Sequence, residues 1–154
     1  ADGTVAASAN RAVPAAMVDA FVAGRADWVR QTQARLGLCR AAEAATPLPE
    51  KTAALAQMQA ICDRYYPEFA ASCPGHTPPR IRVRDMTTRW GSCSLRTGAI
   101  TFSLRLCTMP QPAQEYVVVH EFCHFAHPNH SPAFWAEVAR HMPDYQARRA
   151  LLKR

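Results

Sequence analysis

The stretch that decides the fold is YVVVHEFCHFAHPNHSP, residues 116–132, which contains an HExxH pattern at positions 120 to 124. Two histidines four residues apart lie one turn above each other on an α-helix, so both imidazoles can reach one metal ion. The glutamate after the first histidine is placed to act on a metal-bound water rather than to bind the ion. The pattern predicts a catalytic helix with His120 and His124 as metal ligands and Glu121 as general base.

The residues just before the motif argue against this helix. Val117, Val118 and Val119 are β-branched and favour a strand. The helix therefore requires burial in the tertiary structure to override local propensity. The alternative interpretation is a helix that carries two histidines and binds no metal.

His130 is the candidate third ligand, because a catalytic zinc takes three protein ligands and keeps a fourth position open. On a continuous helix a residue six positions after His124 would point about 120° away, so the helix must end between the two. Pro128 disfavours helical backbone at the preceding residue, and Asn129 tolerates left-handed backbone, so the sequence supplies a break. The alternatives for the third ligand are His127 and Glu137.

The elements around the motif indicate an α+β fold. Apolar residues at helical spacing predict helices in residues 14–36 and 48–65, and alternating residues predict strands at 80–84 and 99–106. Ser131 and Pro132 are typical of a helix N-cap and first turn. We expect one domain over 1–154: a mainly helical half at 1–75, then at 80–154 an antiparallel sheet of two to four strands, the HExxH helix and a C-terminal helix.

Composition excludes several classes of protein. The 154 residues are 49% hydrophobic and 19% charged, which is typical of one globular domain and not of a disordered chain. The net charge of +6 makes a nucleic-acid partner possible, but the basic residues are almost all arginine, and we do not favour it. Without an apolar run of membrane-spanning length or a visible signal peptide, we expect a cytoplasmic protein with no membrane partner. In that compartment its six scattered cysteines are expected to be reduced thiols. The sequence does not predict the oligomeric state.

A further set of short motifs occurs in order along the C-terminal half. They are Trp90-Gly91-Ser92-Cys93, Gly98-Ala99-Ile100, residues 117–124, Asn129-His130-Ser131, Phe134-Trp135 and Met142-Pro143-Asp144-Tyr145. Together they resemble the YgjP-like metallopeptidase family, which is related to the SprT and WLM proteins.

The resemblance implies a small gluzincin-like zincin domain with Zn²⁺ on His120, His124 and His130. It also implies that peptide bonds are cleaved when Glu121 assists the attack of a zinc-bound water. Family members normally begin with further strands, so the chain is expected to lack upstream strands. The substrate is expected to be a peptide or protein that the sequence does not identify.

Two other functions remain open. One is metal-dependent hydrolysis of a nucleotide or another non-peptide substrate, and the other is a DNA-associated module of the SprT-like kind. The group that stabilises the developing oxyanion is also undecided between Tyr145, Arg148 and Arg149. The strand at 99–106 is expected to border the cleft, and Trp90-Gly91 is read mainly as packing.

Overall fold

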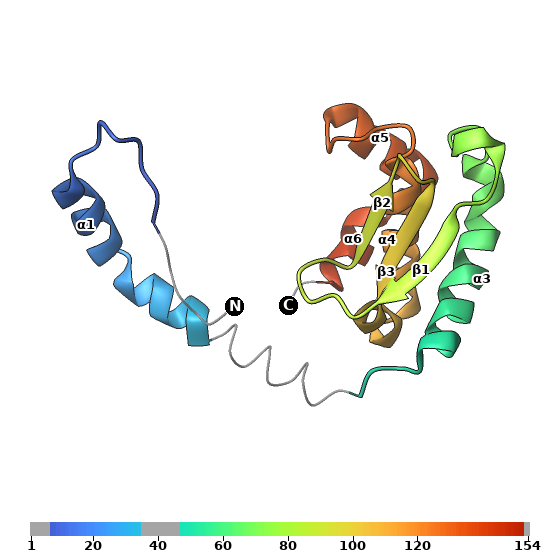
Figure 1. Cartoon of the computed structure of the whole chain (residues 1–154), viewed down its shortest axis with the longest axis horizontal. Coiled ribbons are helices and arrows are strands. Elements are labelled where there is room, and N and C mark those ends of the chain that lie inside the picture. The colour runs from blue at the N-terminus through green and yellow to red at the C-terminus, as the bar shows by residue number, and fades with distance from the viewer. Residues whose placement is uncertain (1–6, 35–46, 153–154) are drawn as a thin grey trace. The chain divides into compact units, whose positions relative to one another are not determined.

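The computed structural model describes residues 7–34 and 47–152, which belong to two compact units that divide between Pro47 and Leu48 (Figure 1). The N-terminal unit contains helix α1 (Ala15–Ala23) and further helical residues at 26–34. A turn at Gly24 and Arg25 separates them, where the sequence predicted one helix over 14–36. No residue of α1 is buried.

The second unit is a mixed α+β structure, as predicted. Its regular elements are α3 (Lys51–Phe69), β1 (Arg80–Arg84), β2 (Gly91–Ser94), β3 (Ala99–Ser103), α4 (Gln111–Cys123), α5 (Pro132–His141) and α6 (Tyr145–Ala150). Short 3₁₀ turns lie at Pro74–His76 and Leu104–Thr108. The helix predicted in the N-terminal half, α3, packs on β1 and α4 and so belongs to the unit that carries the motif. None of the described helices combines the length and hydropathy needed to cross a lipid bilayer.

The sheet has the order β1-β3-β2. β2 and β3 form the predicted antiparallel pair, with Cys93 opposite Ile100. The expectation of a fully antiparallel sheet is wrong for β1, which pairs with β3 in parallel, with Val83 opposite Phe102. The connection at 85–90 reverses the chain but leaves a gap of one strand, and β3 fills that gap after the turn at 95–98. The turn residues in the sequence indicate that the chain reverses there. They do not indicate that a strand from later in the chain lies between β1 and β2.

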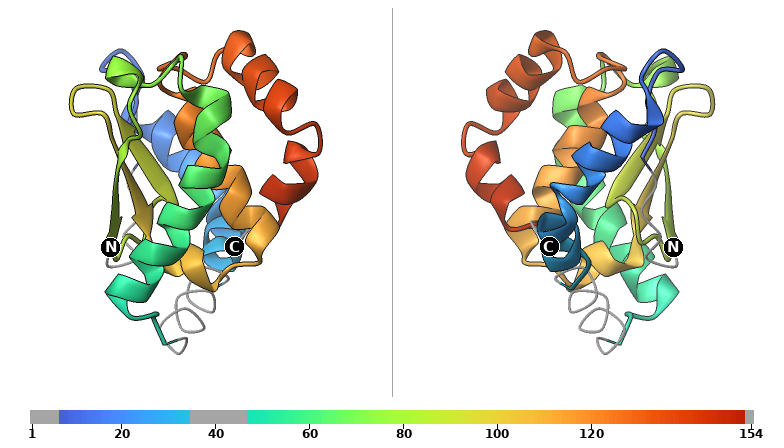
Figure 2. Two further views of the ribbon diagram at one scale, coloured as in Figure 1. Left: turned by 90° about the vertical axis from the view of Figure 1, so that its right-hand side faces the viewer. Right: turned by 90° about the vertical axis from the view of Figure 1, so that its left-hand side faces the viewer.

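Helix α4 forms the centre of the second unit. It contacts α3, α5, α6 and β2, and helices α3 and α4 cover one face of the sheet (Figure 2). Ten of its 13 residues are buried, and Val118, Val119 and Phe122 are fully so. Burying one such side chain stabilises the fold by about 1.5–3 kcal/mol, whereas helix propensities differ by only about 0.7 kcal/mol or less. Burial therefore overrides the strand preference of the valines.

Glu115 joins α4 to its two helical neighbours. Its carboxylate pairs with Arg64 of α3 and accepts a hydrogen bond of 2.5 Å from Arg148 of α6. Burial alone would raise the pKa of Glu115, but hydrogen bonds from Arg64, Arg148 and Gln111 outweigh it and hold the pKa below its usual value. The ionised carboxylate thus anchors the short helix α6.

Replacing Glu115 with glutamine is expected to lower the free energy of unfolding by about 1.5–3 kcal/mol at pH 7, since hydrogen bonds to a charged group are lost. The folded-state pKa lies below the unfolded one, so this contribution is present above pH ~4.3 and disappears as the pH falls through the folded pKa. Denaturant titrations at pH 7 and at successively lower pH measure the difference. The exposed Asp63, changed to asparagine, is the control and should have little effect. A difference between Glu115→Gln and native protein that is independent of pH would contradict the anchoring role.

Candidate metal centre

Three imidazoles lie together at the C-terminal end of α4. His120 and His124 come from the end of α4, and His130 comes from the loop before α5. One nitrogen from each ring lies within 4.8 Å of the other two. The Nε2 atoms of His120 and His130 are 3.0 Å apart. The structure thus brings together the three histidines singled out by the sequence.

The chain reverses immediately after the motif. Helix α4 ends at Cys123 with His124 as its C-cap, and the carbonyl oxygen of His127 lies 3.1 Å from Nδ1 of His124. Asn129 does not adopt the left-handed backbone that the sequence allowed, since His76 is the only non-glycine residue of positive φ in the described chain. The Ser131 hydroxyl accepts a hydrogen bond from Phe134 N–H, which confirms the predicted start of α5.

The alternative third ligands are not part of the cluster. The backbone N–H of His127 donates to Cys123, and its carbonyl contacts His124. The carboxylate of Glu137 forms a salt bridge of 2.6 Å with Arg140 and lies 3.2 Å from His141. Neither side chain joins the group of three imidazoles within the described residues.

Aromatic rings form the floor of the cluster. The buried Phe134 ring lies with its centroid 4.7–4.9 Å from those of all three imidazoles. Trp135 stacks on His130 at 5.6 Å. Burial, with added repulsion from His124 and His130, lowers the pKa of His120 to about 3. Burial also lowers the pKa of His124. The neutral form of an imidazole, which this environment favours for His120 and His124, keeps a lone pair available to a cation.

The donor set fits a transition-metal ion. With Nδ1 of His124 donating to the His127 carbonyl, its Nε2 is the free acceptor, which is how metal-binding histidines are commonly oriented. Nδ1 of His120 is buried without a hydrogen-bond partner in the described part of the chain. Bonds of about 2.0–2.1 Å in a tetrahedral site place ligand nitrogens about 3.3 Å apart, close to the observed 3.0 Å. Movements of the rings would bring the three nitrogens, which lie within 4.8 Å of one another, to this spacing.

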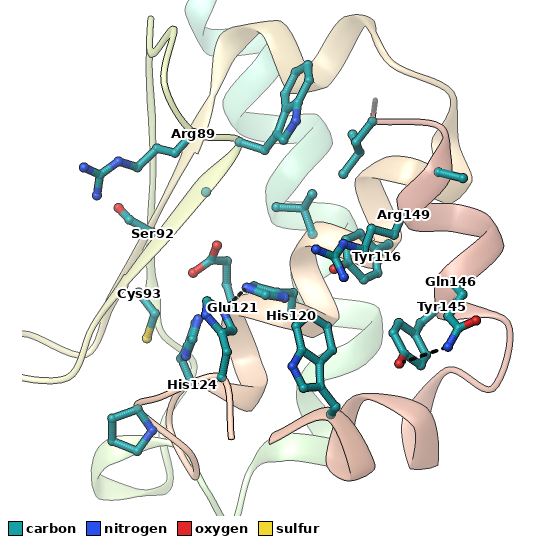
Figure 3. Close-up of a pocket in the computed structure, with 18 of the residues that line it drawn as sticks. Arg89, Ser92, Cys93, Tyr116, His120, Glu121, His124, Tyr145, Gln146 and Arg149 are labelled. Atoms are coloured by element: carbon teal, nitrogen blue, oxygen red, sulfur yellow. Dashed lines mark hydrogen bonds between the residues drawn. The ribbon is translucent and has the colours of Figure 1, made fainter. Parts of the chain in front are cut away.

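Glu121 faces the cleft beside the imidazoles (Figure 3). It is 5% exposed, and burial raises its pKa to about 8, although the backbone N–H of Cys93 and the charge of Arg89 act in the opposite direction. Gly91 of β2 makes this position possible: a Cβ atom there would lie 2.5 Å from Oε1 of Glu121. The sequence predicts mainly a packing role for Trp90-Gly91, and this close approach to Glu121 was not expected. A glycine inside a strand was the available signal, since it often marks a close approach.

The cleft around the cluster has a volume of about 1070 Å³. Residues 89–93 line one wall, α4 lies at the base, and α6 forms the opposite wall (Figure 3). Trp135 of α5 also lines the cleft. This volume is at the upper end of small-molecule sites, which are about 300–1,000 Å³. The bordering strand is β2 and not 99–106 as expected, because β3 occupies the middle of the sheet.

The three candidates on α6 have different surroundings. Arg148 is engaged by Glu115 and by Asp144, at 2.5 and 2.8 Å. The Tyr145 ring stacks on Trp135 at 5.7 Å. The Arg149 guanidinium lies 5.0 Å from the centroid of the same indole. Tyr145 and Arg149 line the cleft, and Arg148 does not.

Comparisons with known proteins agree with this architecture. A profile of the family described as "YgjP-like, metallopeptidase domain" matches residues 43–154. No curated protein matches the sequence significantly. Among solved structures, the metallopeptidase zymogen of Pyrococcus abyssi abylysin is similar, with a TM-score of 0.51 and 19% sequence identity. The similarity covers 60% of this chain and 89% of that one, and it shows a shared fold.

Proposed function

Because the chain belongs to the YgjP-like metallopeptidase family, we propose that it is a zinc-dependent peptidase that cleaves amide bonds in extended peptide segments. The observation that carries this proposal is the convergence of three imidazoles next to one buried carboxyl group. His120, His124 and His130 would hold the ion. When bound, Zn²⁺ lowers the pKa of water toward ~7 and polarises a carbonyl group.

The residues of the chain supply the proton transfers. Glu121 accepts the proton of the attacking water and then delivers it to the leaving amine. The Cys93 N–H and the close backbone of Gly91 hold its carboxylate in place.

The edge of the sheet offers a site for the peptide backbone. β2 is the terminal strand of the sheet and its residues line the cleft. An extended segment can add to such an edge through main-chain hydrogen bonds. This arrangement would place a peptide across the three histidines, which favours amide hydrolysis. Main-chain pairing of this kind does not require a particular side chain on the peptide.

Zinc content tests the ligand set. We expect about one zinc per chain by elemental analysis, with a higher melting temperature on zinc addition because the ion binds only the folded state. His130→Ala should lose the metal and this shift, since one of three ligands is removed. His127→Ala is the matched control and should retain both. If His127→Ala loses zinc and His130→Ala keeps it, the assignment of the third ligand is wrong.

A second candidate is hydrolysis of an anionic non-peptide substrate such as a nucleotide, which the cleft arginines Arg89 and Arg149 favour. An all-imidazole site counts against it, because phosphoryl transfer commonly uses Mg²⁺ with oxygen ligands. Assays of casein and of nucleoside triphosphates, each with Zn²⁺ or Mg²⁺, distinguish the two. Nucleotide hydrolysis with Mg²⁺ alone would replace the peptidase proposal.

A further inference from the structure

Two adjacent arginines on α6 have opposite environments. Arg148 turns toward the helices, where Glu115 of α4 and Asp144 neutralise it. Arg149 turns toward the cleft (Figure 3). Its guanidinium lies over the Trp135 ring, 5.0 Å from the ring centroid. Because α6 has only six residues, its position depends on such side-chain anchoring. The ion pairs of Arg148 therefore fix the direction in which Arg149 points.

No acidic group in the described part of the chain neutralises the charge of Arg149. No carboxylate of the described residues lies within salt-bridge distance of it. Glu121 is the only acidic residue among those that line the cleft. A permanent cation thus faces the space that a substrate would occupy.

The indole leaves the binding edge of this guanidinium accessible. Stacking on an aromatic face uses the π surface and keeps the in-plane N–H donors free. These donors form a rigid fork that matches the two oxygens of a carboxylate. The Trp135 ring also stacks with His130 and Tyr145, at 5.6 and 5.7 Å, so the indole that Arg149 contacts is held in place by its neighbours.

We propose that Arg149, stacked on Trp135, is a carboxylate-binding residue and that the chain prefers peptides with a carboxylate near the scissile bond. The carboxylate comes either from the end of the peptide or from an acidic side chain. This proposal rests on the proposed peptidase function, which makes a carboxylate rather than a phosphate the anion expected in the cleft. Arg149 would thus select substrates, whereas Arg148 only positions the helix.

Peptide binding without turnover tests this role. The Glu121→Gln chain is titrated with three probes: acetyl-pentaalanine with a free carboxylate, the same peptide as an amide, and the amide with one internal glutamate. Indole NMR signals report the dissociation constants. Metal-free protein is measured first, because a carboxylate can also bind zinc directly.

We expect at least one carboxylate probe to bind about tenfold more tightly than the neutral amide, as for a charge-assisted bidentate pair. In the same background, Arg149→Met should abolish this preference and Arg149→Lys should keep only part of it. Arg82→Met is the control, because Arg82 is exposed on β1 outside the cleft. Which probe is preferred identifies the source of the carboxylate.

Equal binding of all three probes, or a preference that survives Arg149→Met, would overturn the proposal. Loss of the preference in Arg82→Met to the same extent would do so as well, since it would indicate only a general effect of net charge. Failure of the peptidase proposal would appear differently, as absence of hydrolysis by the native zinc-loaded chain. The two results are therefore separable.

Discussion

Glu121→Gln should abolish hydrolysis and leave the metal site intact. The amide has nearly the same shape as the carboxylate, but it cannot accept a proton from water. General-base catalysis contributes about 10²–10⁴-fold, so the catalytic rate should fall by at least that factor. The imidazoles are not altered, and zinc content should remain that of the native chain. Steady-state rates on a casein substrate, with zinc measured on the same samples, test both halves of this prediction.

Glu137→Gln is the matched control, because it makes the same chemical change on α5 outside the cleft. Its carboxylate pairs with Arg140, so its replacement should change the rate by less than about twofold, as expected of a pair on the protein surface. A Glu121→Gln protein that keeps a tenth or more of the native rate would show that another group takes the proton. Loss of zinc in this variant would show instead that Glu121 supports the metal site.

The geometry of the HExxH motif could be predicted because it is local. The spacing of His120 and His124 places both rings on one side of a helix whatever surrounds it. Ser131 and Pro132 start α5 for equally local reasons. Even the contradictory signal of the three valines could be resolved, since a helix so rich in apolar residues had to be buried.

Features that depend on long-range packing could not be predicted. Whether His130, His127 or Glu137 joins the two motif histidines depends on the path of the loop at 124–131 and on the floor made by Phe134. The parallel pairing of β1 depends on where β3 inserts. Arg148 and Arg149 are neighbours of the same type, and the long-range ion pair of Arg148 with Glu115 on another helix, which helps to give them different roles, is not visible in the sequence.

Gly91 is the least obvious of the site residues, and Gly91→Ala is expected to impair catalysis severely with little effect on folding. The added Cβ would lie 2.5 Å from Oε1 and 2.9 Å from both Cδ and Cγ of Glu121. The end of a side chain moves more easily than two packed strands, so the carboxylate should be displaced and the sheet retained. A displacement of about 1 Å at a catalytic group can reduce the rate about 10²-fold. Rates, melting temperature and zinc content measured together test this.

Gly24→Ala is the control for the substitution itself, because a Cβ atom there would lie no closer than 3.4 Å to its neighbours. That variant should keep the native rate. An active Gly91→Ala protein would mean that Glu121 tolerates a shifted carboxylate, and the close approach would then be unrelated to catalysis. An unfolded one would mean that the strand cannot accept a side chain at this position. The expected result, a folded and zinc-loaded but inactive protein, would show that the backbone of β2 sets the position of the general base.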